Sequence, residues 1–150
     1  RGYGRKVVCE PFAQSKRDAK TILCMDAQYG CLGKSKAEID RDMFKGLCAF
    51  SGPGVQSVST GRWGAGMFAK HPELTFLQQV IAASEAELKL LKYACFDQEA
   101  EGKAFSAFLK MCDEMQPTVG SLCAALLASA NRENRSAQKL LDFIAAELRK

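Results

Sequence analysis

Residues Ser59–Phe68, with the sequence STGRWGAGMF, place three glycines and two large aromatic side chains within ten positions. The short run VQSVST (55–60) leads into this stretch, and a helix-like run that begins after Pro72 follows it. A strand, a glycine-rich loop and a helix in this order can bind phosphate oxygens through backbone N–H groups and the helix N-terminus. The stretch therefore raises two hypotheses, a phosphate-binding loop and a plain structural turn.

The glycine spacing argues against two well-known kinds of phosphate-binding loop. No Gly-Lys-Ser/Thr follows, which excludes a P-loop, and the order G-x-x-G-x-G differs from the dinucleotide-binding fingerprint. Gly61, Gly64 and Gly66 permit positive φ and a close approach of the backbone to a ligand. The glycine spacing alone fits a phosphate-binding loop and a structural turn about equally well. Trp63 and Phe68, which can form a wall for a base or a ribose, favour the phosphate loop.

Strand and helix patterns alternate around the loop and predict an α/β fold whose sheet is at least partly parallel. The expected strands are residues 5–9, 19–27, 55–60 and 90–96, and the expected helices are 35–50, 73–90, 98–115, one capped by Thr118 and one capped by Ser136. The apolar run 19–27 reads as the central strand, and Ser35 with Glu38 has the spacing of a capping box. Ligands of such sheets lie at the carboxyl ends of the strands, where the glycine loop and Phe96 fall.

Composition limits the class of protein and of partner. The 150 residues suffice for one domain with one core, and 47% hydrophobic with 25% charged residues is ordinary globular composition. A net charge of +4 and a pI near 8.7 are compatible with an anionic ligand, but fall short of a nucleic-acid-binding surface. No apolar run reaches the roughly 18 residues that cross a membrane.

The cysteines and the single histidine argue against a metal site. Seven cysteines, an odd number, are spread along the chain without any CxxC spacing, and His71 is the only histidine. We therefore expect free thiols, a reducing compartment such as the nucleus or the cytoplasm, and neither a metal nor a cofactor.

Other polar and aromatic residues have ordinary interpretations. We expect His71 to be a surface or helix-start residue, Glu85 and Glu87 to be solvated, and Asp26 to make local turn bonds at a strand end. Phe96 is equally consistent with a core position and with stacking on an adenine. No pair of carboxylates stands out as the proton donor and base of a hydrolase.

The loop STGRWGAGMF, the run LTFLQQVIAASEAELKLLKYACF and the segment PTVGSL together resemble the carboxyl-terminal half of the catalytic domain of poly(ADP-ribose) glycohydrolases. TILCMDAQ resembles the strand of that family that ends in Asp-Ala, and GYGR resembles its tyrosine-bearing turn. The resemblance runs over roughly residues 1–125 and is most specific in the loop. It implies an incomplete macrodomain-type α/β fold, a mixed sheet flanked by helices, with further helices at the C-terminus.

The resemblance also implies a reaction and a site. Members of the family hydrolyse the ribose–ribose O-glycosidic bond of poly(ADP-ribose) and release ADP-ribose. The implied diphosphate loop consists of Gly64, Ala65, Gly66, Met67 and Phe68, with backbone N–H groups on the phosphates. Phe68 would also pack on the distal ribose, Phe96 would stack near the adenine, and Tyr3 would touch the diphosphate or ribose. The implied partners are poly(ADP-ribose), ADP-ribose and poly(ADP-ribosyl)ated proteins, with no nucleic-acid duplex and no membrane.

The chain departs from the family pattern at three places. Arg62 stands where the family usually has a substrate-orienting asparagine, and we expect its longer, charged side chain to bind the anionic substrate instead. AKHPEL follows the loop where another glycine pair and an aspartate are expected. The catalytic signature, a glycine triplet followed by Gln-Glu-Glu, is absent from the sequence. We expect it upstream of Arg1, so that residues 1–150 are a carboxyl-terminal part without a catalytic residue. The alternative is a non-hydrolytic ADP-ribose-binding module.

Overall fold

The computed structural model describes residues 22–27, 29, 35–96, 98–131 and 139–150. Its elements are α1 (Lys36–Phe50), β1 (Ser57–Gly61), α2 (Pro72–Glu85), β2 (Leu90–Ala94), α3 (Glu99–Met115), α4 (Val119–Ala128), the 3-10 turn η1 (Ser129–Asn131) and α5 (Leu140–Leu148). β1 and β2 pair in parallel, with Gly61 opposite Ala94, and α2 connects them. The predicted α/β class, parallel pairing and carboxyl-terminal helices are therefore present.

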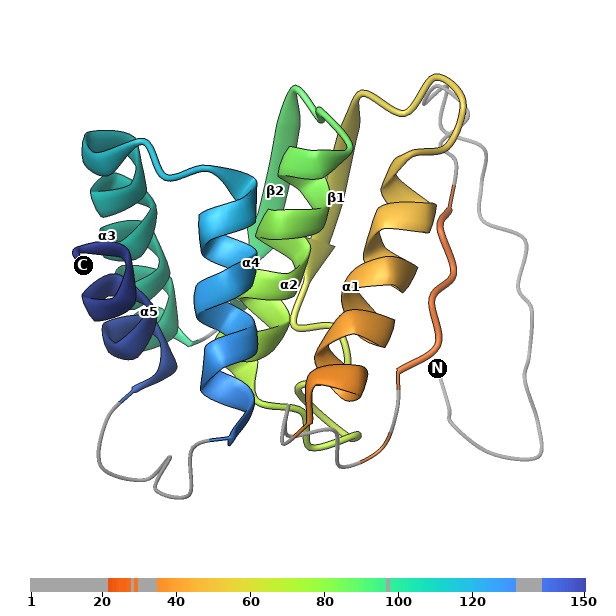
Figure 1. The fold of residues 1–150 in the computed structure, drawn as a ribbon. Coiled ribbons are helices and arrows are strands. Elements are labelled where there is room, and N and C mark those ends of the chain that lie inside the picture. The colour runs from red at the N-terminus through yellow and green to blue at the C-terminus, as the bar shows by residue number, and fades with distance from the viewer. Residues whose placement is uncertain (1–21, 28, 30–34, 97, 132–138) are drawn as a thin grey trace.

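Helix α2 is the centre of the fold. In Figure 1 it stands in front of the two strands, with α1 on one side and α4 on the other. The helix is apolar around most of its circumference, as expected for a helix buried by neighbours on several sides. Its Phe76 ring stacks on Phe105 of α3 at 4.1 Å between centroids and meets the edge of Tyr93 of β2 at 5.3 Å. This aromatic cluster joins the sheet, α2 and α3 in one core.

Local signals set the helix ends largely as predicted. Ser35 Oγ accepts a hydrogen bond from the Glu38 N–H at 3.2 Å, and Thr118 Oγ1 accepts one from the Ser121 N–H at 3.0 Å. Both expected N-caps are confirmed. Helix α2 ends at Glu85, earlier than the predicted residue 90, because Glu87 takes a left-handed φ of 52° and turns the chain toward β2.

The predicted central strand over 19–27 is wrong in its described part. Residues 22–27 have no strand structure, and no strand among the described residues pairs with them. Leu23 and Met25 pack against the cluster around Phe50, whereas Ile22 is 84% exposed. The segment thus buries only one side. The Met25 carbonyl accepts a hydrogen bond from Trp63 Nε1 at 3.3 Å, but no described strand continues the sheet along the segment. The expected strand 5–9 and the Ser136 cap lie outside the described residues.

The sheet has one covered and one exposed face. Val58 and Thr60 of β1 and Leu91 and Tyr93 of β2 are partly buried, whereas the alternating residues between them are exposed. Because the strands are parallel, both end at the same edge of the sheet. The glycine loop and the N-terminus of α2 follow β1 there, and the Phe96 turn and the N-terminus of α3 follow β2.

Candidate functional site

The glycine loop is a succession of tight turns. The Ala65 N–H donates to the Arg62 carbonyl at 2.9 Å, and the Ala69 N–H donates to the Gly66 carbonyl at 3.0 Å. Gly64 has a φ of 73°, and a Cβ at this position would lie 2.5 Å from Lys70 Cδ. Only glycine fits there, so Gly64 is required by the loop itself. The N–H of Ala65, a predicted phosphate donor, is already occupied by this internal bond.

A buried lysine supports the glycine loop on its inner side. Lys70 Nζ lies 2.7 Å from Asp42 Oδ2 and 3.7 Å from the centroid of the Trp63 ring, and both charged side chains are fully buried. Arg41 binds the other oxygen of Asp42 at 2.8 Å. Burial by itself raises the pKa of Asp42, but Lys70 and Arg41 outweigh it and hold this pKa below its ordinary value. The Lys70 N–H also donates to the Gly64 carbonyl at 3.0 Å.

Two polar side chains of α2 fix the start of the loop. Thr75 Oγ1 donates to the Trp63 carbonyl at 3.1 Å, and Gln79 Nε2 donates to the Gly61 carbonyl at 3.0 Å. Gln79 Oε1 accepts from the Thr60 hydroxyl at 2.6 Å. Thr75 and Gln79 are fully buried, so these bonds satisfy groups that would otherwise be costly to bury. Neither residue was predicted from the sequence, although two polar side chains within an apolar helix are a recognisable signal.

The outer side of the loop leaves backbone donors available. Within the described part of the chain, no acceptor is bound to the N–H groups of Gly66, Met67 and Phe68. These three residues are exposed, and the Met67 and Phe68 side chains are 72% and 42% accessible. A Cβ added at Gly66 would meet no atom within 4 Å. Unlike Gly64, Gly66 has no packing reason to be glycine, which is consistent with a close approach of a ligand.

Arg62 connects the loop to α3. Its Nη2 donates to Glu101 Oε1 at 3.0 Å, and about a quarter of each side chain is exposed. Arg62 Nε, Glu101 Oε2 and the Tyr93 hydroxyl are buried without a hydrogen-bond partner among the described residues. Burial, followed by the charges of Cys95 and Glu101, raises the pKa of Tyr93. A direct contact between Arg62 and a ligand stays a prediction.

Phe96 lies at the same edge as the glycine loop. Its Cε2 would be 3.6 Å from a Cβ built on Gly61, and its side chain is 83% exposed. Its φ of 53° is unusual for a bulky residue and turns the chain sharply toward α3. The core interpretation of Phe96 is therefore wrong, and the stacking interpretation stays a prediction. Tyr3 lies outside the described residues.

The remaining candidates have structural roles. His71 is the N-cap residue of α2, as its helix-start interpretation predicts, and Glu85 and Glu87 are exposed. The prediction of a strand-end Asp26 with local turn bonds is wrong, because residues 22–27 form no strand and its carboxylate pairs with Lys45 of α1 at 2.7 Å. The hydrogen bond from Lys45 lowers the pKa of Asp26. The described cysteines are free thiols: Cys24, Cys48, Cys95, Cys112 and Cys123.

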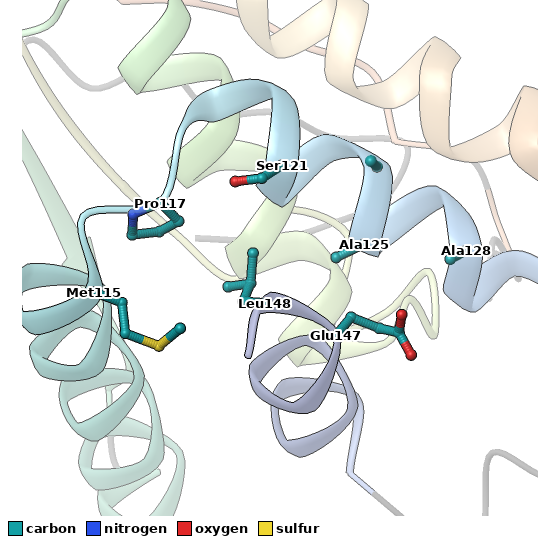
Figure 2. A pocket seen from close by; sticks show the side chains of 8 residues that line it. Met115, Pro117, Ser121, Ala125, Ala128, Glu147 and Leu148 are labelled. Atoms are coloured by element: carbon teal, nitrogen blue, oxygen red, sulfur yellow. The ribbon is translucent and has the colours of Figure 1, made fainter. Parts of the chain in front are cut away.

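A cavity of about 370 Å³ lies at the other end of the helical layer (Figure 2). It is lined by Met115, Pro117, Ser121, Ala124, Ala125, Ala128, Glu147 and Leu148. No lining residue belongs to the glycine loop or to the Phe96 turn. Among the described residues no cluster of His, Cys, Asp and Glu is suited to hold a metal ion, and no helix has the length and apolarity that crossing a membrane demands.

A parallel strand pair with a glycine loop at its carboxyl edge, leading into a helix N-terminus, is an arrangement that α/β domains use to bind phosphate-bearing ligands. The family model described as poly(ADP-ribose) glycohydrolase, macro domain fold, matches residues 3–103, about two thirds of the chain. The chain belongs to the poly(ADP-ribose) glycohydrolase family, and it corresponds to the carboxyl-terminal half of the catalytic domain. The match ends within α3, and the assignment of residues 1–150 to a single domain stays a prediction.

Proposed function

We propose that this chain supplies the diphosphate-binding loop of an enzyme that hydrolyses ribose–ribose O-glycosidic bonds in poly(ADP-ribose) and releases ADP-ribose. The observation that carries the proposal is the set of exposed N–H groups without acceptors at Gly66, Met67 and Phe68. Family membership supports glycohydrolase chemistry in general. The substrate and the roles of single residues are our inference.

The loop suits a diphosphate because its donors are fixed before the ligand arrives. Phosphate oxygens accept hydrogen bonds from successive N–H groups, and the nearby N-terminus of α2 adds a favourable dipole. The buried pair of Lys70 and Asp42 holds the inner side of the loop, so little ordering of the backbone is needed on binding. The exposed Phe68 is available to a ribose, and Phe96 at the same edge is available to the adenine.

The catalytic carboxylates are proposed to lie outside residues 1–150. Glycoside hydrolysis needs a carboxylic acid that protonates the leaving oxygen. The described carboxylates around the loop have other partners. Asp26, whose neighbours Met25 and Ala27 lie against Trp63 and Gly64, is paired with Lys45. Asp42 is paired with Lys70, Glu101 is paired with Arg62, and Glu73 accepts a hydrogen bond from the Leu141 N–H at the start of α5. None is positioned as a free acid over the loop.

The same observations support a second candidate function, a non-hydrolytic ADP-ribose-binding module. Such a module requires the loop and not the acid. In either case the partners that we propose are poly(ADP-ribose), ADP-ribose and poly(ADP-ribosyl)ated proteins, in the nucleus or the cytoplasm. The two candidates differ only in whether bound polymer is cleaved.

Polymer cleavage by the full-length gene product separates the candidates. We expect release of ADP-ribose from poly(ADP-ribose), and loss of both binding and release in Gly66→Val, which places two methyl groups where the ligand approaches. Gly120→Val is the matched control, because Gly120 is exposed at the start of α4 and far from the loop in the sequence. ADP-ribose binding without cleavage contradicts the hydrolase, and absence of binding contradicts both candidates.

A further inference from the structure

Two loops meet at the carboxyl edge of the sheet, and one ion pair joins them. Arg62 lies in the glycine loop and is the first residue after β1. Glu101 lies in the first turn of α3, five residues after the exposed Phe96. Among the described residues, their 3.0 Å contact is the only ion pair between the glycine loop and α3. Its place suggests that it does more than add stability.

The pair is unlike an ordinary surface ion pair. Glu99 and Lys103, in the same helix, form a pair of 2.7 Å, but their side chains are 80% and 76% exposed, and such pairs contribute little. Arg62 and Glu101 are about three quarters covered, and each has a further buried polar atom without a partner. A partly buried, charge-assisted bond is stronger and more directional than an exposed one.

The backbone of Arg62 is itself part of the phosphate loop. Its carbonyl accepts the Ala65 N–H, which closes the turn that leads to Gly66. A shift of the Arg62 backbone would therefore tilt this turn and re-aim the N–H groups beyond it, and the ion pair of the Arg62 side chain restrains such a shift. Gln79 and Thr75 hold the neighbouring carbonyls of Gly61 and Trp63, so the Arg62 side chain is the remaining restraint from the side of α3.

From these contacts we propose that Glu101 is a positioning residue for ADP-ribose binding, which acts through Arg62 to fix the glycine loop relative to the Phe96 turn. The inference rests on the proposed function, since it assumes that the loop binds the diphosphate and that Phe96 lies on the adenine side. Glu101 does not touch the ligand. It sets the spacing between two parts of the site that one ligand must reach together.

The test is a double-mutant cycle in the full-length gene product, with ADP-ribose affinity measured by calorimetry. Glu101→Gln keeps the shape and removes the charge, and we expect it to weaken binding roughly tenfold, the size of one charge-assisted bond. In an Arg62→Gln background the same change is expected to alter affinity less than twofold, because its partner is gone. Glu99→Gln is the matched control, with the same charge change in the same helical turn and no expected effect.

A second readout does not depend on the ligand. Trp63 follows Arg62 and is the only tryptophan of the 150 residues. Its fluorescence emission is obtained by subtracting the spectrum of a Trp63→Phe reference variant. We expect Glu101→Gln, and not Glu99→Gln, to shift the emission of Trp63 while the melting temperature stays within about 2 °C, as for a change below 1 kcal/mol.

Three results would overturn the inference. They are unchanged affinity in Glu101→Gln, with or without a shift of Trp63 emission, an equal loss in both Arg62 backgrounds, and a loss fully explained by a lower melting temperature. Absence of ADP-ribose binding by the unsubstituted protein contradicts the proposed function itself, and with it the inference. That result is distinct from the other three, because it appears before any substitution is made.

Discussion

Replacement of Lys70 by methionine tests the buried support of the glycine loop. Methionine keeps most of the apolar stem that packs on Gly64, but it removes the ammonium group that lies 2.7 Å from Asp42 and 3.7 Å from the Trp63 ring centroid. The carboxylate of Asp42 stays fully buried after the change. Because a buried charge that loses its partner is expensive, the substitution should destabilise the fold.

The expected magnitude follows from what remains around Asp42. Loss of one partner of a buried ion pair typically costs about 3–5 kcal/mol. Arg41 remains at 2.8 Å from the other carboxylate oxygen, so the cost should fall at the lower end, about 3 kcal/mol. For a domain of this size that corresponds to a decrease in melting temperature of roughly 6–12 °C.

Urea denaturation of the two variants Lys70→Met and Lys103→Met provides the measurement. Lys103 forms an exposed pair with Glu99, and its replacement should change the free energy of unfolding by less than about 1 kcal/mol. The double variant Lys70→Met with Asp42→Leu should recover much of the loss, because no charge is then left buried alone. Equal effects of Lys70→Met and Lys103→Met would refute the reasoning.

Three further predictions concern the same region. The folded-state pKa of Asp42 lies below its ordinary value of 3.8, so its contribution to stability is present above that value and lost as the pH falls through the folded pKa. Below about pH 5 the unsubstituted protein should therefore lose stability more steeply than Asp42→Asn. Parallel plots of the free energy of unfolding against pH for the two proteins would contradict this. Gly64→Ala should lower stability by about 2 kcal/mol in thermal melts, because of the positive φ and the 2.5 Å approach to Lys70 Cδ; a change under about 0.5 kcal/mol, the size of a neutral surface change, would argue against a rigid loop. Gln79→Leu leaves the Gly61 carbonyl without its side-chain donor, at a cost of about 1–3 kcal/mol in urea denaturation; an unchanged midpoint would show that this bond is not needed.

Features that depend on a few neighbouring residues could be predicted from the sequence. Ser35 and Thr118 cap their helices because each has a backbone N–H three residues ahead within reach. Pro72 begins α2 because a proline at the first helical position loses no hydrogen bond. The glycine loop was recognised from its own ten residues, and its family assignment is confirmed.

Features that depend on distant residues could not be predicted. Nothing near Lys70 in the sequence indicates that its ammonium group is buried on Asp42 of α1. The apolar run 19–27 has the composition of a central strand, but composition does not supply a neighbouring strand, and residues 22–27 pair with none among the described residues. The pairing of Arg62 with Glu101 likewise follows from the parallel register that brings the ends of β1 and β2 together.

The central claim is that the outer backbone of the glycine loop binds the diphosphate of ADP-ribose. The most direct measurement is the change in backbone amide chemical shifts when ADP-ribose is added to the isotopically labelled protein. The account predicts that the amides of Gly66, Met67 and Phe68 show the largest downfield shifts, as their free N–H groups acquire phosphate acceptors. Binding that leaves these three amides unmoved, or the absence of any shift with ADP-ribose, would contradict it.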